Sequence, residues 1–337
     1  FSACLANLVV SEHTDLSSPT PDSEIKRLLR PGGLAIRTGG HAINYRRPPL
    51  DGTGDWTHQY ADPANTAASN DALGAANSTP DFSLQWIGRP GADFGIDRNP
   101  RMPAPLAVNG RLFHQGMNRM TALDSFNGQV LWTVEIPELR RVNIPHDCGN
   151  WCADQDRLYV AVRDRAWAID AATGKRTGAF KLTTGQRGSH DWGFIACSED
   201  LLFGSSVPCG GEFKQFWGGA MWFDKAGDIN ATALVCSDTV FAYNKKNAHG
   251  LWAYGRGLII NSTITIANGR MWFIESRPPA ESRPDTGRVA GNALWEHAHV
   301  VCLDTATGKV LWERPLEKPG ALTANRGFIQ IAFGCHT

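Results

Sequence analysis

The sequence of 337 residues has no excess of charge of either sign, because 33 Lys and Arg residues balance 33 Asp and Glu residues. A net charge near zero gives no general attraction to nucleic acid or to an anionic membrane surface. The sequence also lacks any run of about 18 apolar residues, so it predicts no transmembrane segment. The expected partners are therefore other proteins or a small-molecule substrate, and not nucleic acid.

Functional cysteine spacings are missing as well. The eight cysteines form no CxxC or CxxCH motif and no adjacent pair, which argues against thioredoxin-type redox chemistry, a zinc ribbon and covalently attached haem. Cys148 and Cys152 could close a small disulfide ring in an oxidising compartment. The interpretation that we favour is that most of the cysteines are small buried apolar side chains.

What the sequence does contain is an internal repeat. The stretch "TALDSFNGQVLW" ends at Trp132, and similar stretches end at Trp252 and Trp312. A second signature, a short polar turn before alternating apolar residues, precedes these stretches and recurs at Gly110, Asp156, Asp200 and Gly269. Most units are therefore near 45 residues long, and one unit is enlarged around residues 207–235.

A unit of this length, made of short strands and turns, has the size of a four-stranded propeller blade. The apolar residues alternate with a period of two, which argues against a solenoid of paired helices. We predict an all-β fold, a β-propeller of four-stranded blades, over residues 56–337. About four to five blades are expected, and the propeller is expected to be incomplete at its C-terminal end.

The repeated Asp and Gly predict a tight turn before the outer strand, since Asp supplies a side-chain acceptor and Gly tolerates a positive φ. The Trp at the end of that strand is expected to pack on the neighbouring blade. We therefore predict structural roles for Trp86, Asp124, Gly128, Trp132, Asp170, Gly174, Trp252, Asp304, Gly308 and Trp312.

The pattern A-x-D-x-x-x-G-x-x-x-W at Ala122–Trp132 resembles the tryptophan-docking motif of the pyrroloquinoline quinone (PQQ) repeat. Residues 51–88 are similar to the entry segment of quinoprotein propellers, in which Trp86 would end the first outer strand. The segments "GNWC", "FWGG" and "IINSTITI" resemble PQQ-like proteins of planctomycete type. The resemblance covers roughly residues 51–337 and implies a PQQ-type propeller, PQQ and Ca²⁺ as cofactors, and a periplasmic or exported location.

The first residues differ from the repeat. Residues 6–12 predict a buried strand, and residues 24–37 predict a helix that Pro31-Gly32-Gly33 ends before a second strand. This order resembles the late part of a Rossmann-like S-adenosylmethionine-dependent methyltransferase, so we assign residues 1–37 to a fragment of such an α/β domain. S-adenosylmethionine is expected only with the missing half of that domain, and a cytoplasmic location is then the alternative. Residues 38–55 predict a linker.

Polar and aromatic residues precede several strands where propeller loops reach the axis. Quinoprotein chemistry requires a carboxylate base, an oxygen cage for Ca²⁺ and a stacking surface. The catalytic candidates are Glu275, Asp147 and Asp191. The cofactor-binding candidates are Trp192, Trp151, His190, Asn150, Asn261 and Arg277. The alternative for all of them is that they satisfy loop backbone groups.

His297 and His299 lie two residues apart and would share one face of a strand, a spacing that could bind a metal. No third ligand follows from the sequence. We therefore expect two partly exposed histidines and assign no metal.

Three functions remain open. The first is a binding or scaffold module without catalysis. The second is a PQQ- and Ca²⁺-dependent quinoprotein oxidoreductase acting on an alcohol or sugar, and the third is a substrate-presenting module of a methyltransferase. The repeat stabilises blades in any of these roles. The resembled alcohol dehydrogenases carry adjacent cysteines above the quinone, and their absence here favours the first function.

Overall fold

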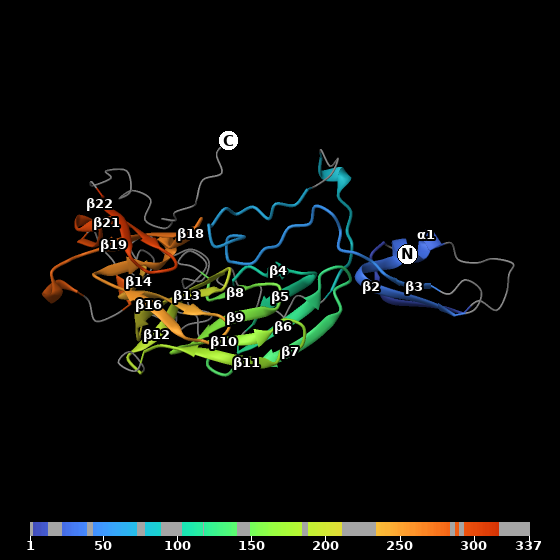
Figure 1. Ribbon diagram of the computed structural model, residues 1–337, viewed down its shortest axis with the longest axis horizontal. Helices are drawn as coiled ribbons and strands as arrows, with labels where there is room; N and C mark the ends of the chain where they lie inside the picture. Colours follow the sequence, from blue (N-terminus) through green and yellow to red (C-terminus); the bar gives the residue numbers. More distant parts are fainter. Residues whose placement is uncertain are drawn as a thin grey trace, which may run out of the picture.

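The computed structural model describes residues 3–12, 22–38, 43–72, 78–88, 103–116, 118–139, 149–183, 188–210, 234–283, 287–289 and 293–316. These residues form a small N-terminal sheet and a series of antiparallel sheets that follow one another along the molecule (Figure 1). Within this part of the chain, no helix is long and apolar enough to cross a membrane.

Three sheets have the four-stranded blade form that the repeat predicts. The first blade contains β4 (Leu106–Val108), β5 (Arg111–Gln115), β6 (Arg119–Asp124) and β7 (Val130–Glu135). The second contains β8 (Trp151–Ala153), β9 (Arg157–Val162), β10 (Arg165–Asp170) and β11 (Arg176–Lys181). The third contains β12 (His190–Ser198), β13 (Leu201–Pro208), β15 (Thr239–Asn244) and β16 (Gly250–Tyr254). The predicted all-β propeller fold is confirmed.

The fourth blade has a divided inner edge. Its inner strand is split into β17 (Leu258–Ile260) and β18 (Thr265–Ala267) by the 3-10 turn η2 (Asn261–Thr263), and both parts pair with β19 (Arg270–Ser276). The sheet continues through β21 (Ala298–Asp304) and β22 (Val310–Pro315). The enlarged unit contributes β14 (Leu234–Ser237), which pairs with β17 and with β20 (Arg288–Val289).

Short helical segments complete the described elements, and they are η1 (Thr79–Asp81), η3 (Ala280–Ser282) and α3 (Ala293–Glu296).

The Asp-to-Gly turns before the outer strands share one geometry. The backbone N–H of the Gly donates to the carbonyl of the Asp four residues earlier, at 2.9 Å for Gly128 and Asp124 and at 2.9 Å for Gly174 and Asp170. Gly308 repeats this bond, and all three glycines have φ near +70°. The local sequence therefore dictates each turn, because a residue without Cβ adopts this φ without strain.

Each indole near the end of an outer segment lies on the Gly turn of the following blade. Trp132 is 8 % exposed, its Nε1 donates to the carbonyl of Ala171 at 3.0 Å, and its ring lies against Gly174. The same arrangement joins Trp252 to Gly308 and Trp86 to Gly128. Trp86 does this without the predicted strand, since residues 82–88 are not in a strand. By contrast, Trp312 on β22 is 40 % exposed.

Residues 56–66 cross the inner edges of four blades in turn, as the blue segment above the sheets in Figure 1 indicates. Trp56 pairs with Ala107 of the first blade, and the carbonyl of Thr57 accepts from Ala153 of the second. The bonds to the third and fourth blades run from the N–H of Cys197 to His58 Nε2 and from the N–H of Ile266 to the carbonyl of Pro63. This crossing segment therefore belongs to the inner face of the propeller.

The N-terminal sheet has the order β1-β2-β3, with β1 (Ala6–Glu12) and β2 (Leu29–Thr38) parallel and joined through α1 (Asp22–Leu28). The predicted strand, helix and strand are present, but the first strand is not buried, since Leu8 and Val10 are 53% and 58% exposed. Two boundaries were also wrong. The helix ends at Leu28, and the Pro-Gly-Gly lies inside β2, where Gly33 passes too close to the carbonyl of Ala6 to carry a side chain. In addition, β3 (Ile43–Arg46) pairs with β2 inside the segment expected to be linker.

Arg30 connects this sheet to the first blade, since its Nε lies 2.6 Å from Oδ2 of Asp124, a side chain that is 1 % exposed. We expect Arg30→Ala to lower the free energy of unfolding by about 1–3 kcal/mol, because a buried carboxylate would lose its counter-ion. Urea denaturation measures this change. Arg37→Ala is the matched control, because Arg37 pairs with the exposed Asp22, and a drop as large as that of Arg30→Ala would contradict the expectation.

Candidate functional site

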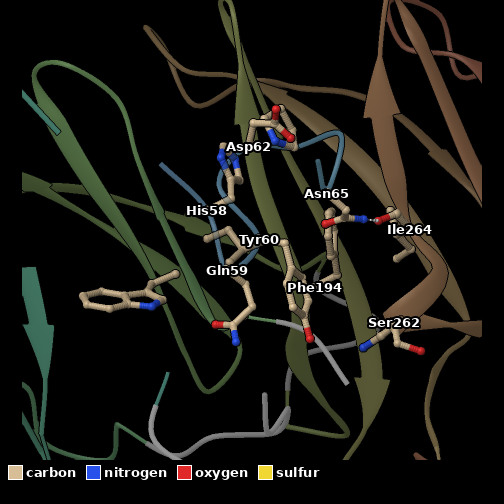
Figure 2. A pocket seen from close by; sticks show the side chains of 13 residues that line it. His58, Gln59, Tyr60, Asp62, Asn65, Phe194, Ser262 and Ile264 are labelled. Carbon is tan, nitrogen blue, oxygen red and sulfur yellow. Dashed lines mark hydrogen bonds between the residues drawn. The ribbon is translucent and has the colours of Figure 1, made fainter. Parts of the chain in front are cut away.

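A pocket opens between the crossing segment and the inner strands of the second, third and fourth blades. It has about 380 Å³ of space between its walls, part of it continuous with solvent. Figure 2 shows Gln59 and Ser262 on opposite sides of it. The lining residues are His58, Gln59, Tyr60, Asp62, Pro63, Asn65, Gly149, Trp151, Phe194, Ile195, Asn261, Ser262 and Ile264.

Irregular backbone at the inner edges creates the space. The pairing of β12 with β13 shifts register between Trp192 and Ile195, and Gly193 lies so close to Val207 that a Cβ would come within 2.5 Å of it. On the fourth blade, η2 replaces two to three residues of inner strand. Because neither blade has a straight inner edge here, Phe194 and Ser262 line the pocket walls.

Part of the lining is fixed by hydrogen bonds. Asn261 is fully buried, and its Oδ1 accepts from Ser237 Oγ at 2.6 Å. Asn65 donates from Nδ2 to the carbonyl of Ile264 at 3.0 Å. Both oxygens of Asp62 accept hydrogen bonds from Thr66, from its backbone N–H and from its hydroxyl. These side chains hold their positions before any ligand binds.

Other polar atoms of the lining have no partner among the described residues. They are Oε1 of Gln59, Nε1 of Trp151 and Oγ of Ser262, each inaccessible to solvent. A buried polar atom without a hydrogen bond costs about 1–3 kcal/mol. Three such atoms lie beside one pocket, and a ligand or ordered water can supply their bonds once the side chains turn toward the open space.

The charge of the described lining is low. It contains neither Lys nor Arg, and its one carboxylate is Asp62. Trp151 and Asn261, which the sequence predicts as cofactor-binding residues, do line the pocket. Asn150 lies beside the lining, is 2 % exposed and has no partner among the described residues for either side-chain polar atom. Asp147 lies outside the described residues.

Glu275 and Arg277 do not line this pocket, so their assignment as base and cofactor ligand stays a prediction. Glu275 is fully buried and accepts from Tyr254 Oη, from the N–H of Arg256 and from Arg277 Nε, each at 2.9 Å. Arg277 also binds Glu313 through Nη2 at 2.9 Å. A buried carboxylate with three donors inside a salt bridge is typical of a structural group, because three of its roughly four lone-pair sites are already used.

Trp192 is buried in the core and is not a stacking surface of the pocket. Its ring meets Phe241 edge to face with centroids 4.9 Å apart, and it covers Gly204, where a Cβ would lie 2.4 Å from Cζ2. Asp191 is 4 % exposed and has Arg163 Nε 3.9 Å away. Neither residue reaches the pocket.

His190 also lies outside the pocket. Its Nε2 is 2.7 Å from Oδ2 of Asp238, and its Nδ1 is 2.8 Å from Ser189 Oγ. His190 therefore ties β12 to the start of β15, which is a structural contact.

The weak metal candidates His297 and His299 do not share a strand face, because β21 begins at Ala298. His299 Nδ1 bonds to the carbonyl of His297 at 3.0 Å. Among the described residues, the group with the ligands for a metal is instead His58, Cys152 and Cys197. Burial raises the pKa of the Cys152 thiol well above its usual range.

Sequence reasoning missed the crossing segment and this cysteine pair. A signal for the pair exists, since Cys152 and Cys197 are separated by about one repeat and each lies one residue before the last residue of an inner strand. No comparable signal marks Gln59 or Tyr60, whose places follow from the path of residues 56–66 over the blades.

The described lining does not by itself fit PQQ with Ca²⁺. A quinone that carries several carboxylates requires cationic side chains, and Ca²⁺ requires free carboxylate oxygens. The described lining offers no Lys or Arg, and Thr66 already uses both oxygens of Asp62. No chemical step through PQQ is derived for these residues.

No protein family and no curated protein matches the sequence. The structure is similar to quinohemoprotein alcohol dehydrogenase from Comamonas testosteroni, with a TM-score of 0.51 and 19% identity over 78% of this chain. It is also similar to quinohemoprotein alcohol dehydrogenase ADHIIG from Pseudomonas putida HK5, with a TM-score of 0.48 and 13% identity over 77% of this chain. The third comparison is BamB from Moraxella catarrhalis, with a TM-score of 0.37 and 12% identity over 69% of this chain and 55% of BamB.

The chain spans 41% and 40% of the length of the two dehydrogenases. The likeness to the first of them establishes the fold, which is a partial β-propeller of the quinoprotein dehydrogenase type. None of these three structures is a methyltransferase, so that origin for residues 1–37 stays a prediction, as does the planctomycete type.

Proposed function

We propose that the chain is a binding module whose pocket takes a small, uncharged, hydroxyl-rich molecule such as a sugar. The observation that carries the proposal is the set of buried atoms beside the pocket that have no partner in the described part of the chain, Gln59 Oε1, Trp151 Nε1 and Ser262 Oγ. Gln59 Oε1 needs a donor, whereas Trp151 Nε1 needs an acceptor. A hydroxyl group serves both needs, because it donates one hydrogen bond and accepts others.

The charge and the aromatic content of the lining support the same ligand class. A strongly anionic ligand would find no Lys or Arg among the described lining residues. Tyr60 is partly exposed and lines the pocket, so its ring is the surface against which the apolar C–H groups of a sugar would pack. Trp151 and Phe194 also line the pocket but are 1% and 7% exposed. A periplasmic or exported location is part of this proposal, and a cytoplasmic one is the alternative.

Ser262→Ala is expected to weaken binding of such a ligand about 2- to 10-fold, the effect of one neutral hydrogen bond. Gln59→Leu is expected to weaken it at least as much, since it removes an acceptor. Titration with D-glucose, maltose and myo-inositol, followed by tryptophan fluorescence and calorimetry, measures these changes. Ser282→Ala is the matched control, because Ser282 is exposed in η3.

The proposal fails if none of the three compounds gives a saturable signal with the folded chain, or if binding ignores both pocket substitutions. A parallel titration with PQQ and Ca²⁺ separates the oxidoreductase alternative. If PQQ binds saturably and the sugars give no signal, the oxidoreductase alternative is the better explanation.

A protein-binding scaffold is the second candidate function, and one feature of the outer edges favours it. Leu131, Leu251 and Leu311 each precede the Trp of an outer strand and are 37%, 44% and 49% exposed. Single exposed apolar side chains are common on protein surfaces, but these three recur at the same position of three blades, which favours a shared contact role. Under this alternative, Leu251→Asp and Leu311→Asp abolish binding of a protein partner that the unsubstituted chain binds in a pull-down. Neither substitution is expected to alter the pocket.

A further inference from the structure

Three buried side chains with metal-binding atoms meet where the crossing segment passes between two blades. Cys152 comes from β8 of the second blade, Cys197 from β12 of the third, and His58 from the crossing segment. The two sulfurs and one imidazole nitrogen all lie within 4.8 Å of one another. The residues are 0%, 5% and 6% exposed, respectively.

The imidazole of His58 is held in the tautomer that a metal requires. Nε2 accepts a hydrogen bond from the N–H of Cys197 at 3.1 Å, so this nitrogen is the unprotonated one. Because it has a single lone pair, a metal would have to replace this hydrogen bond. The proton is then on Nδ1, 2.6 Å from the hydroxyl of Thr57, which in turn donates to the carbonyl of Ala61. Metal-bound histidines generally donate their second ring N–H in this way, which fixes the ring orientation.

The spacing of the three atoms is close to that of a zinc site. With Zn–S near 2.3 Å and Zn–N near 2.0–2.1 Å, tetrahedral ligand atoms lie roughly 3.5–3.8 Å apart. Atoms that are at most 4.8 Å apart therefore need to approach by no more than about 1 Å. Rotamer adjustment of two cysteines supplies a movement of this size without displacing the strands.

The donor set selects the metal. Thiolate and imidazole together suit Zn²⁺, whereas Ca²⁺ and Mg²⁺ prefer oxygen ligands. A site with three protein ligands keeps a fourth position for water. Because His58 also lines the pocket, water from the pocket has a route to the fourth position.

We propose that His58, Cys152 and Cys197 form a Zn²⁺ site that joins the second blade, the third blade and the crossing segment. When zinc binds, each cysteine thiol releases its proton to solvent and becomes a thiolate ligand. The metal stays Zn²⁺ throughout, so the step involves no oxidation or reduction. The site would stabilise the folded chain, because three segments far apart in sequence hold the ion together only after folding. The inference does not depend on which ligand the neighbouring pocket takes.

The competing chemistry for two close thiols is a disulfide between Cys152 and Cys197. It requires an oxidant and would leave His58 without a role beyond its hydrogen bonds. Both cysteines are free in this structure. A disulfide and a zinc site make opposite predictions for thiol counts, so one set of measurements separates them.

The test uses the full chain purified under reducing conditions, stripped with a chelator and titrated with Zn²⁺. One equivalent of zinc per chain is expected by elemental analysis, with a higher melting temperature than the stripped chain. Cys152→Ser, Cys197→Ser and His58→Ala are each expected to weaken zinc affinity at least tenfold. Cys302→Ser is the matched control, because Cys302 is a buried free cysteine on β21, and it should bind as the unchanged chain does.

A second measurement on the unchanged chain covers variants that fail to fold. Zn²⁺ should slow alkylation of Cys152 and Cys197 and leave the alkylation rate of Cys302 unaltered. Peptide mass spectrometry measures the rate at each cysteine. Co²⁺ in place of zinc should give the strong thiolate-to-metal absorption band. Absence of stoichiometric zinc in the folded chain overturns the proposal. So does a Cys152–Cys197 disulfide that persists until a reductant is added and that blocks zinc uptake.

Discussion

Glu275→Gln is expected to lower the free energy of unfolding by about 2–4 kcal/mol. The substitution keeps the shape of the side chain and removes its charge, which leaves the mostly buried Arg277 without its inner partner. Breaking a buried ion pair costs about 3–5 kcal/mol, and we lower this range because the Arg277 side chain is 20% exposed. Urea denaturation followed by tryptophan fluorescence measures the change.

Glu313→Gln is the matched control for this prediction, because Glu313 binds the same guanidinium from a position where its side chain is 35% exposed. Exposed ion pairs contribute about 0–1 kcal/mol, so a small loss is expected. Equal losses from the two substitutions would contradict the view that burial of Glu275 gives the pair its importance.

Gly174→Ala is expected to destabilise the fold by about 2–5 kcal/mol. Gly174 has φ +73°, a conformation that costs an alanine about 1–2 kcal/mol. The new Cβ would also lie 2.7 Å from Cδ2 of Trp132, so the indole would have to leave its position over the turn. Overpacking of this kind typically costs about 1–3 kcal/mol. The unfolding midpoint and the fluorescence of Trp132 measure the two effects.

Gly178→Ala, four residues further along the same hairpin, is the matched control. Nothing lies within 4 Å of a Cβ placed at Gly178 in β11, so a change within about 0.5 kcal/mol is expected. If Gly174→Ala were as harmless as this control, the contact between Trp132 and the turn would not contribute to holding the two blades together.

The blades could be predicted from the sequence because the signals that specify them are local. The turn from Asp170 to Gly174 requires only one acceptor and one residue that tolerates positive φ, and both are visible in the repeat. Alternating apolar residues then give strands of period two. The turn positions Gly110 and Gly269 were predicted correctly for the same reason, since a two-residue hairpin depends on neighbours in the chain.

Boundaries failed where pairing partners decide them. β3 lies in a segment poor in apolar residues, and it forms a strand because β2 offers it an edge. The predicted strand before Trp86 is absent, yet Trp86 still lies over Gly128. In the first case a contact across the sheet overrides composition, and in the second the contact of the indole with the turn forms without a strand.

The candidate site could not be read from the sequence, because its walls come from segments that are distant along the chain. Trp151 and Trp192 look alike in sequence, each following polar residues and opening or entering an inner strand. Both are 1% exposed, but the structure places Trp151 in the lining of the pocket and Trp192 against Phe241 in the core. The register shift in β12 begins at Trp192. Glu275 was similarly indistinguishable from a catalytic base until Tyr254, Arg256 and Arg277 were found around it.

The sequence alone thus determined the repeat, the turns and the blade architecture, since each depends on residues within one hairpin. The tertiary structure decided which polar groups meet. It brought Cys152 and Cys197 from equivalent places in consecutive blades to His58 of the crossing segment, and it laid Gln59 opposite Ser262 (Figure 2). The physical reason is that a blade is stabilised by neighbours in sequence, whereas the inner face forms only when several blades and the crossing segment pack together.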